Sequence, residues 1–389
     1  MFMENIPIPA NLKILKRIVM PLSLIITLFI SSCSKKGIEE PAPKPSAFPP
    51  STTTFSATDA TIAFNSFNNI YYSPTDKLYY STTEKKGIAA IWTQAIYWDI
   101  VMNAYERTKD QAYYKMITDM YDGGAKRYDN YNWDNSVEWF IYDDMMWWVM
   151  SLARAYEITK NQVYLDKAKS GFTKVWNGSY DPVKGGMFWD FKHSGKNACI
   201  NFPTVIAAMR LYNITKDESY LTKAKSIYTW SRENLFDISK GRVADHKVGD
   251  NNPGFEDYTY NQGTLIGAAI LLYRNTNIQS YLDDAKLAAN YTKNTMSDPS
   301  GILPAEGDWN EQGVLKAIFA QYLADLAKAY PAGDYAKWAV FNANTAWENR
   351  DFGRGTMHRN YKVPCPTGIV QSYESSSAVA FMQLFAPTN

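Results

Sequence analysis

Apolar residues recur at intervals of three and four along the chain, from about residue 56 towards the C-terminus. In the stretches 164–176 and 220–231, tyrosine, alanine and a further aromatic residue share one helical face while the lysines point away from it. No strand-rich block interrupts this series. The pattern predicts an all-α protein built from amphipathic helices.

One sequence pattern occurs four times, in the segments 105–114, 156–165, 212–221 and 273–282. Each copy has a tyrosine, a threonine three residues later and another tyrosine five residues after that. The threonines lie 51, 56 and 61 residues apart, which is typical of a repeated supersecondary unit. An apolar helical stretch precedes each threonine, and the polar residues after it suit a helix end, a tight turn and a new N-cap. Each copy therefore predicts a helical hairpin.

Two further hairpins complete the series and predict about twelve helices. A looser fifth hairpin covers 314–330 and 334–350, and a sixth must pair a helix near 56–69 with one near 370–386. A closed ring is favoured over an open solenoid because both termini are needed for one unit and no polar capping repeat is evident. The long, irregular insertions also favour a closed ring; they are 177–196, 235–262 and 295–310. We therefore predict an (α/α)6 toroid over 56–389, with function in the loops at one mouth.

The N-terminus carries the features of an export signal. Basic residues (Lys13, Lys16 and Arg17) precede the apolar run 18–30, which is too short for a comfortable transmembrane helix. The sequence Ile-Ser-Ser-Cys that ends at Cys33 resembles a bacterial lipobox. We predict a lipoprotein signal peptide over 1–32, lipidation of Cys33 and a Pro/Ser/Thr-rich tether over 33–55, hence an exported lipoprotein on the outer membrane or cell surface, with the periplasmic face also possible. An ordinary secretory signal is the alternative.

The net charge and the cysteine content limit which partners, disulfides and metal sites are expected. The formal net charge is only +1, so nothing indicates electrostatic binding of nucleic acid. Besides Cys33, only Cys199 and Cys365 are present, which is too few for a disulfide framework, and no Cys/His spacing resembles a zinc site. We expect a buried thiol at Cys199, no metal or cofactor, and a monomer that contacts the membrane through its lipid alone.

The stretch "IYDDMMWW" (141–148) places Asp143 and Asp144 at the start of a helix predicted over about 143–158. Acidic residues in a first helical turn are favourable because of the helix dipole, and that alone explains many such pairs. Here, however, tryptophans surround the pair at 133, 139, 147 and 148, and two carboxylates in an aromatic cleft are the minimum equipment for glycoside hydrolysis. Consecutive Cα atoms lie about 3.8 Å apart, which favours the short carboxyl separation of retaining enzymes over the longer inverting one.

Three motifs resemble glycoside hydrolase family 76, whose bacterial members are endo-α-1,6-mannanases. They are "YDDMMWW" (142–148), "KNACINFP" (196–203) and "TYNQGTLIGA" (259–268), and the resemblance extends over about 60–385. It implies an (α/α)6 fold, an α-mannan substrate and a retaining mechanism. It also implies that Asp143 is the nucleophile and Asp144 the general acid/base.

Other residues near these motifs are candidates for substrate binding. Each also has a structural interpretation, as a helix cap, a core residue or a solvated group; the candidates are Trp147, Trp148, Trp189, Lys196, Asn197, Asn201, Tyr260, Asn261 and Gln262. Of the two adjacent tryptophans, 147 and 148, spacing alone does not decide which faces the sugar. We expect Glu306 and Asp308, on an insertion, to be solvated.

Three functions are consistent with these features. The leading hypothesis is a retaining, endo-acting α-1,6-mannanase. A non-catalytic surface lipoprotein that binds glycans would need only the aromatic platforms. Another (α/α)6 glycosidase or an uronyl hydrolase is the third possibility, but such enzymes usually place their acids on separate segments.

Overall fold

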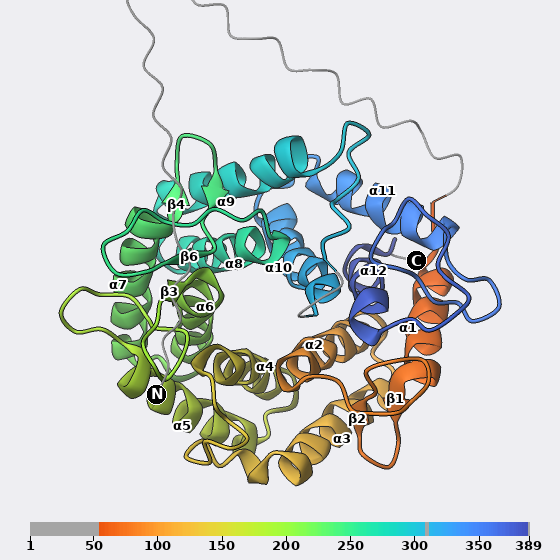
Figure 1. The fold of residues 1–389 in the computed structure, drawn as a ribbon, viewed down its shortest axis with the longest axis horizontal. Coiled ribbons are helices and arrows are strands. Elements are labelled where there is room, and N and C mark those ends of the chain that lie inside the picture. Colours follow the sequence, from red (N-terminus) through yellow and green to blue (C-terminus); the bar gives the residue numbers. More distant parts are fainter. Residues whose placement is uncertain (1–53, 308–310, 388–389) are drawn as a thin grey trace, which may run out of the picture. The chain divides into compact units, whose positions relative to one another are not determined.

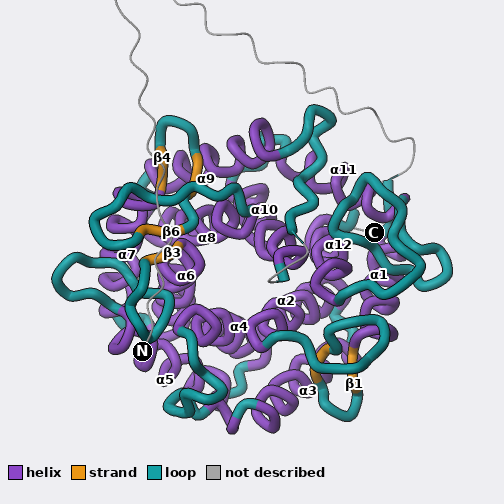
Figure 2. Tube along the Cα trace, viewed as in Figure 1, coloured by secondary structure: helices purple, strands orange, loops and turns teal. Residues whose placement is uncertain are grey.

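A computed structural model of the protein describes residues 54–307 and 311–387, and this part contains twelve α-helices in two concentric rings (Figures 1 and 2). The inner ring consists of α2 (Ile91–Thr108), α4 (Tyr142–Thr159), α6 (Ala198–Thr215), α8 (Thr259–Thr276), α10 (Leu315–Ala329) and α12 (Ser372–Phe385). The outer ring consists of α1 (Ala57–Tyr71), α3 (Gln111–Arg127), α5 (Gln162–Ser179), α7 (Glu218–Leu235), α9 (Gln279–Tyr291) and α11 (Tyr335–Glu348). Each inner helix packs against the next, and α12 packs against both α10 and α2, which closes the ring. The predicted (α/α)6 toroid is confirmed.

The threonine of each repeat shapes the turn of its hairpin, as the α4–α5 turn illustrates. Thr159 Oγ1 donates to the carbonyl of Ala155 at 2.7 Å and accepts from the backbone N–H of Asn161 at 3.2 Å. Lys160 between them adopts the left-handed conformation that often ends a helix, with φ 59°. The Asn161 side chain then caps α5 by accepting from the N–H of Val163 at 3.1 Å. The same threonine bonds recur at residues 108, 215 and 276.

The two mouths of the ring differ because the connections between helices alternate in length. The hairpin turns are short and lie at the C-terminal ends of inner helices, whereas long segments lead into the N-terminal ends. These segments contain η1 (Asp129–Tyr131), η2 (Thr292–Met296), η3 (Gln312–Val314) and the strands β1 (Tyr72–Ser73), β2 (Leu78–Tyr79), β3 (Lys196–Asn197), β4 (Phe236–Asp237), β5 (Arg242–Val243) and β6 (His246–Lys247). The strands form three antiparallel pairs, β1–β2, β3–β6 and β4–β5. Long loops and inner-helix N-termini therefore share one mouth.

Large aromatic side chains fill the space between the helices. Trp98, Trp148 and Trp338 have no exposed surface, and each indole N–H donates to a backbone carbonyl. The acceptors are the carbonyls of residues 117, 91 and 301, at 3.0, 2.9 and 2.7 Å. Burial of these rings thus leaves no indole donor unsatisfied at those positions.

Several predictions fall on residues outside the described ones: the signal peptide (1–32), Cys33, most of the tether (33–55) and Asp308. Phe55, assigned to the tether, is 2% exposed, and its N–H donates to Asn344 Oδ1 at 2.9 Å. The packed domain therefore includes Phe55. Within 54–307 and 311–387, no helix has the length and apolar character needed to cross a membrane.

Candidate active site

A cleft of about 710 Å³ opens at the mouth that carries the long loops. Six of the predicted site residues line it: Asp143, Asp144, Trp147, Trp189, Asn197 and Tyr260. They come from the N-terminal turns of α4 and α8, the N-cap of α6 and the loop before α6. Residues from three repeats therefore meet at one place.

Asp143 and Asp144 lie in the first turn of α4, and a neighbouring loop fixes where that turn begins. Ile141, the N-cap residue, is extended and forms an antiparallel bridge with Asp190. The N–H of Tyr142 donates to the carbonyl of Trp189 at 3.1 Å. The loop that carries Trp189 is thereby tied to the helix that carries both acids.

The surroundings of the two acids raise both pKa values, but unequally. Burial raises the pKa of Asp143 to about 6, while hydrogen bonds from the Cys199 thiol and the N–H of Asp144 act to lower it. Burial, followed by the charges of Asp143 and Glu311, raises the pKa of Asp144 well above its ordinary value. Although both side chains keep some surface open to the cleft, Asp143 ionises more readily than Asp144.

Aromatic rings form a continuous row along the cleft, hereafter the aromatic row: Trp92, Trp147, Tyr260 and Tyr258. Successive ring centroids lie 6.2, 6.5 and 6.1 Å apart, with tilted planes. Such rings offer apolar faces of the size of a pyranose ring, and their edges carry polar groups.

A third carboxylate in the cleft, Asp245, is held by neighbouring side chains. It accepts from Asn261 Nδ2 at 3.0 Å and from the Tyr260 hydroxyl at 3.4 Å through Oδ1, and its Oδ2 lies 3.1 Å from His246 Nδ1. This arrangement fixes Asp245 as a rigid acceptor for a ligand hydroxyl or N–H.

Five of the predicted substrate-binding residues do not line the cleft, and for two of them packing inside the ring explains why. Trp148 is fully buried and donates to the carbonyl of Ile91, so its prediction as a sugar contact is wrong. Asn201 is also fully buried; it accepts from the N–H of Met187 at 2.8 Å and donates to the carbonyl of the same residue at 3.0 Å. Asn201 thus braces the loop before α6 from inside.

The other three residues that were predicted to bind substrate but do not line the cleft support the loops of the mouth; they are Lys196, Asn261 and Gln262. Lys196 pairs with Asp181 at 2.7 Å and lies over the rings of Phe188 and Trp230. Gln262, in the amide orientation that satisfies its neighbours, bonds the backbone of residues 241 and 243. Asn261 is buried and acts on the cleft through Asp245.

Seven residues that line the cleft with a polar side-chain group were not predicted from the sequence: Trp92, Cys199, Asp245, Glu256, Tyr258, Glu311 and Gln312. Cys199 is buried, as expected, but it also contacts the acid pair Asp143/Asp144. Of the other six, five lie on or at the end of the long insertions before α8 and α10. The sequence predicted that these insertions are functional, but it did not indicate which of their side chains turn inward.

The expectation that Glu306 is solvated is wrong. Glu306 has a 2% exposed side chain, lies 3.6 Å from the fully buried Lys316 Nζ and accepts from the N–H and hydroxyl of Thr259, each at 2.9 Å. Burial raises the pKa of Glu306 and lowers that of Lys316 to about 8. The pair joins the loop before α10 to the start of α8 beneath the mouth.

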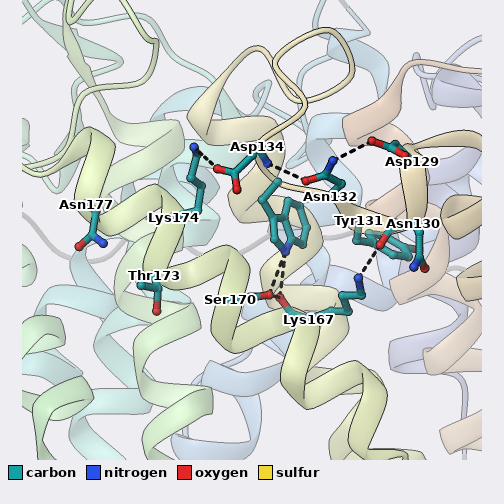
Figure 3. A pocket seen from close by; sticks show the side chains of 11 residues that line it. Asp129, Asn130, Tyr131, Asn132, Asp134, Lys167, Ser170, Thr173, Lys174 and Asn177 are labelled. Atoms are coloured by element: carbon teal, nitrogen blue, oxygen red, sulfur yellow. Dashed lines mark hydrogen bonds and ion pairs between the residues drawn. The ribbon is translucent and has the colours of Figure 1, made fainter.

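A second hollow, of about 640 Å³, lies between the loop after α3 and helix α5 (Figure 3). Its polar groups largely satisfy one another: Lys174 pairs with Asp134, and Lys167 donates to the carbonyl of Asn130. The indole N–H of Trp133 donates to Ser170 Oγ and to the carbonyl of Lys167, each at 3.2 Å. This hollow contains neither a close carboxylate pair nor an open aromatic face, so the cleft is the candidate active site.

In the described residues, no group of three or more His, Cys, Asp or Glu side chains is arranged to hold a metal ion. The side chains that line the cleft carry carboxyl groups, amides, hydroxyls, a thiol and aromatic rings.

Comparison with known proteins identifies the family of this chain. Residues 55–386 match the model of glycosyl hydrolase family 76. A curated relative, the mannan endo-1,6-alpha-mannosidase DCW1 of Candida albicans, is 23% identical over 310 residues, which cover 69% of this chain and 67% of that protein.

Two solved structures of the α-1,6-mannanase GH76A from Salegentibacter sp. HEL1_6 are also similar. The first is 29% identical, with a TM-score of 0.77, and covers 85% of this chain and 98% of that one. The second is an inactive variant with two adjacent aspartates replaced by alanine, in complex with α-1,6-mannotetrose; it is 28% identical, with a TM-score of 0.76 and the same coverage. Since the family model spans nearly all of the described residues, the chain belongs to glycosyl hydrolase family 76 and is a glycoside hydrolase.

Proposed function

We propose that the protein is a retaining, endo-acting α-1,6-mannanase. The observation that carries this proposal is the acid pair, Asp143 and Asp144, adjacent in the first turn of α4 at the cleft and with unequal tendencies to ionise. Retaining glycosidases need one ionised and one protonated carboxyl group close together.

In the proposed mechanism, Asp143 acts as the nucleophile. Its carboxylate oxygen bonds to the anomeric carbon while the glycosidic C–O bond breaks, and Asp144 gives its proton to the departing oxygen. A water molecule then attacks the anomeric carbon, its proton passes to Asp144, and the bond to Asp143 breaks. The hydrogen bonds that Asp143 receives from Cys199 and from the N–H of Asp144 support this division of roles because they favour the ionised form.

Two lines of support point to α-1,6-mannan as the substrate. The Candida relative is a mannan endo-1,6-alpha-mannosidase, and the Salegentibacter enzyme binds α-1,6-mannotetrose when two adjacent aspartates are replaced. In this chain, Phe140, Trp189, Trp92 and Glu311 line the cleft together with the acids. The proposal of internal cleavage rests on the Candida relative, whose name describes an endo-acting enzyme.

The test uses purified protein and linear α-1,6-mannan. We expect wild-type protein to release reducing ends and Asp143→Asn to lose at least about a thousandfold in turnover while its melting temperature is maintained. Proton NMR of the first product should show the α-anomer. Undiminished turnover in the variant, or an initial β-anomer, would refute the mechanism, and absence of any cleavage by wild type would refute the substrate.

We further propose that Cys33 anchors the protein to a membrane through lipid, as the basic region, apolar run and lipobox-like sequence indicate. Cells that express the full chain should incorporate labelled fatty acid into it, and Cys33→Ser should abolish this label. Continued labelling of that variant would contradict the proposal.

A further inference from the structure

One wall of the cleft is built by two residues that are distant in sequence. Trp92, in the first turn of α2, donates its indole N–H to Glu311 Oε2 at 3.3 Å. Both side chains are half-buried and line the cleft. This contact joins α2 to the segment before α10 across the mouth of the ring.

The backbone of Glu311 supports a specific role for its side chain. Its φ and ψ are 56° and 22°, in the left-handed region that residues with a Cβ atom rarely adopt. Such strained conformations concentrate at functional sites, where the surrounding structure enforces them. Here the conformation places a carboxylate at the cleft and beside an indole donor.

The Trp92–Glu311 wall lies close to the acid pair. The ring of Trp92 lies 6.2 Å from that of Trp147, which is one turn of α4 after Asp144. The charge of Glu311 also acts on Asp144, the proposed acid/base. In a retaining glycosidase, the nucleophile meets the anomeric carbon and the acid/base meets the glycosidic oxygen. The wall near Asp144 is therefore the one that faces the departing sugar.

Building on the proposed function, we propose that Trp92 and Glu311 form the leaving-group subsite and determine how the covalent intermediate divides between water and a sugar hydroxyl. Glu311 can accept hydrogen bonds from two hydroxyls of a pyranose, and the indole can stack against its C–H face. Trp92 also leads into the aromatic row, since its ring lies 6.2 Å from Trp147.

The step that this subsite would control exchanges the same bonds and the same proton whether the acceptor is water or a sugar hydroxyl. The attacking O–H, from water or from the bound sugar, forms a bond to the anomeric carbon as the bond to Asp143 breaks. The proton of that O–H passes to Asp144. A sugar held by Trp92 and Glu311 brings its hydroxyl to the intermediate at high effective concentration, so transfer competes with hydrolysis.

The test uses α-1,6-mannobiosyl fluoride as donor, because its leaving group is fluoride and needs no sugar subsite. Methyl α-mannoside serves as acceptor, and the ratio of transfer product to hydrolysis product is measured at fixed acceptor concentration. We expect Glu311→Gln and Trp92→Ala each to lower this ratio about tenfold; both products come from one covalent intermediate, so a change in the rate at which that intermediate forms does not alter the ratio. Trp92→Phe, which keeps a ring but loses the N–H donor, should lower the ratio less.

Glu84→Gln, which removes an exposed carboxylate outside the cleft, is the charge control and should keep the wild-type ratio. Circular dichroism and melting temperature establish that each variant is folded. An unchanged ratio in folded Glu311→Gln and Trp92→Ala would overturn the inference while leaving the proposed function intact. If wild type cleaves neither the fluoride nor α-1,6-mannan, the proposed function itself fails.

Discussion

The backbone N–H of Asp144 donates a hydrogen bond to Asp143 Oδ1 at 2.9 Å. One acid thus stabilises the charge of the other through its backbone, while its own carboxyl group, beside that charge, is driven towards the protonated form. Two identical side chains become chemically different although they are adjacent in sequence.

This difference predicts how azide should rescue variants of each acid. In Asp144→Ala, azide should attack the intermediate on Asp143 and give the α-mannosyl azide from an activated aryl α-mannoside, since azide needs no general base. In Asp143→Ala, azide should take the place of the nucleophile and give the β-azide. Product NMR distinguishes the two anomers, and an exchanged pattern would reverse the assigned roles.

The pH profile of activity should be bell-shaped. Activity needs Asp143 ionised and Asp144 protonated, so kcat/KM should rise as the pH passes through about 6 and fall where Asp144 loses its proton. Initial rates on α-1,6-mannan from pH 4 to 9 would test this. A profile already flat at pH 4.5 would show that the pKa of Asp143 is not raised.

The same pKa shifts predict that the acid pair destabilises the fold at neutral pH. Because folding raises the pKa of both aspartates, the folded protein binds more protons than the unfolded chain as the pH rises above about 4, and their contribution to stability falls. The fall due to Asp143 is centred below about pH 6, whereas that due to Asp144 continues to higher pH. Asp144→Asn should therefore increase the free energy of unfolding at pH 7 by about 1–2 kcal/mol, with a smaller gain at pH 4. Denaturant unfolding at both values is the measurement, and equal or lower stability at pH 7 would contradict it.

Trp148 and Trp189 should respond to substitution in opposite ways. Trp148→Ala removes a fully buried ring and its bond to the carbonyl of Ile91, so we expect a loss of about 3–5 kcal/mol of stability. Trp189→Ala removes a half-buried ring at the cleft, so we expect KM for mannan to rise with a nearly unchanged melting temperature. Thermal melts and kinetics on both variants test the two roles, and the reverse pattern would exclude them.

Loss of one partner of the buried pair Glu306 and Lys316 should lower the stability of the fold more than loss of both partners. Lys316→Met leaves the Glu306 carboxylate buried without its cation and should cost about 3–5 kcal/mol. The double variant Lys316→Met, Glu306→Gln removes both charges and should recover a large part of that loss. Urea unfolding of both variants is the measurement, and equal destabilisation would show that the ion pair is not the cause.

The local sequence was sufficient to predict the architecture of helices and turns. The helix predicted over 143–158 is Tyr142–Thr159 in the structure, and the four threonine turns lie where the repeat places them. Helical periodicity and turn chemistry depend on residues that are close in the chain, so both can be recognised without knowledge of the fold. The acid pair was found for the same reason, since both members share one short motif.

The rest of the site depends on contacts between distant segments. Lys196 and Asn201 stand beside Asn197 in one motif, yet Lys196 turns to Asp181 and Asn201 to Met187, and only Asn197 reaches the cleft. Nothing in the local pattern records which partner each polar side chain finds. Glu311 reaches the cleft through a left-handed backbone and a bond to Trp92, 219 residues away in sequence.

By itself, therefore, the sequence determined the twelve helices, their pairing into six hairpins and the position of two adjacent acids. Only the tertiary structure decided which side chains meet at the mouth. Trp147 and Trp148 illustrate the physical reason: successive residues of a helix point about 100° apart, and packing of α4 within the ring sets which direction is inward. That rotation leaves Trp147 at the cleft and Trp148 in the core.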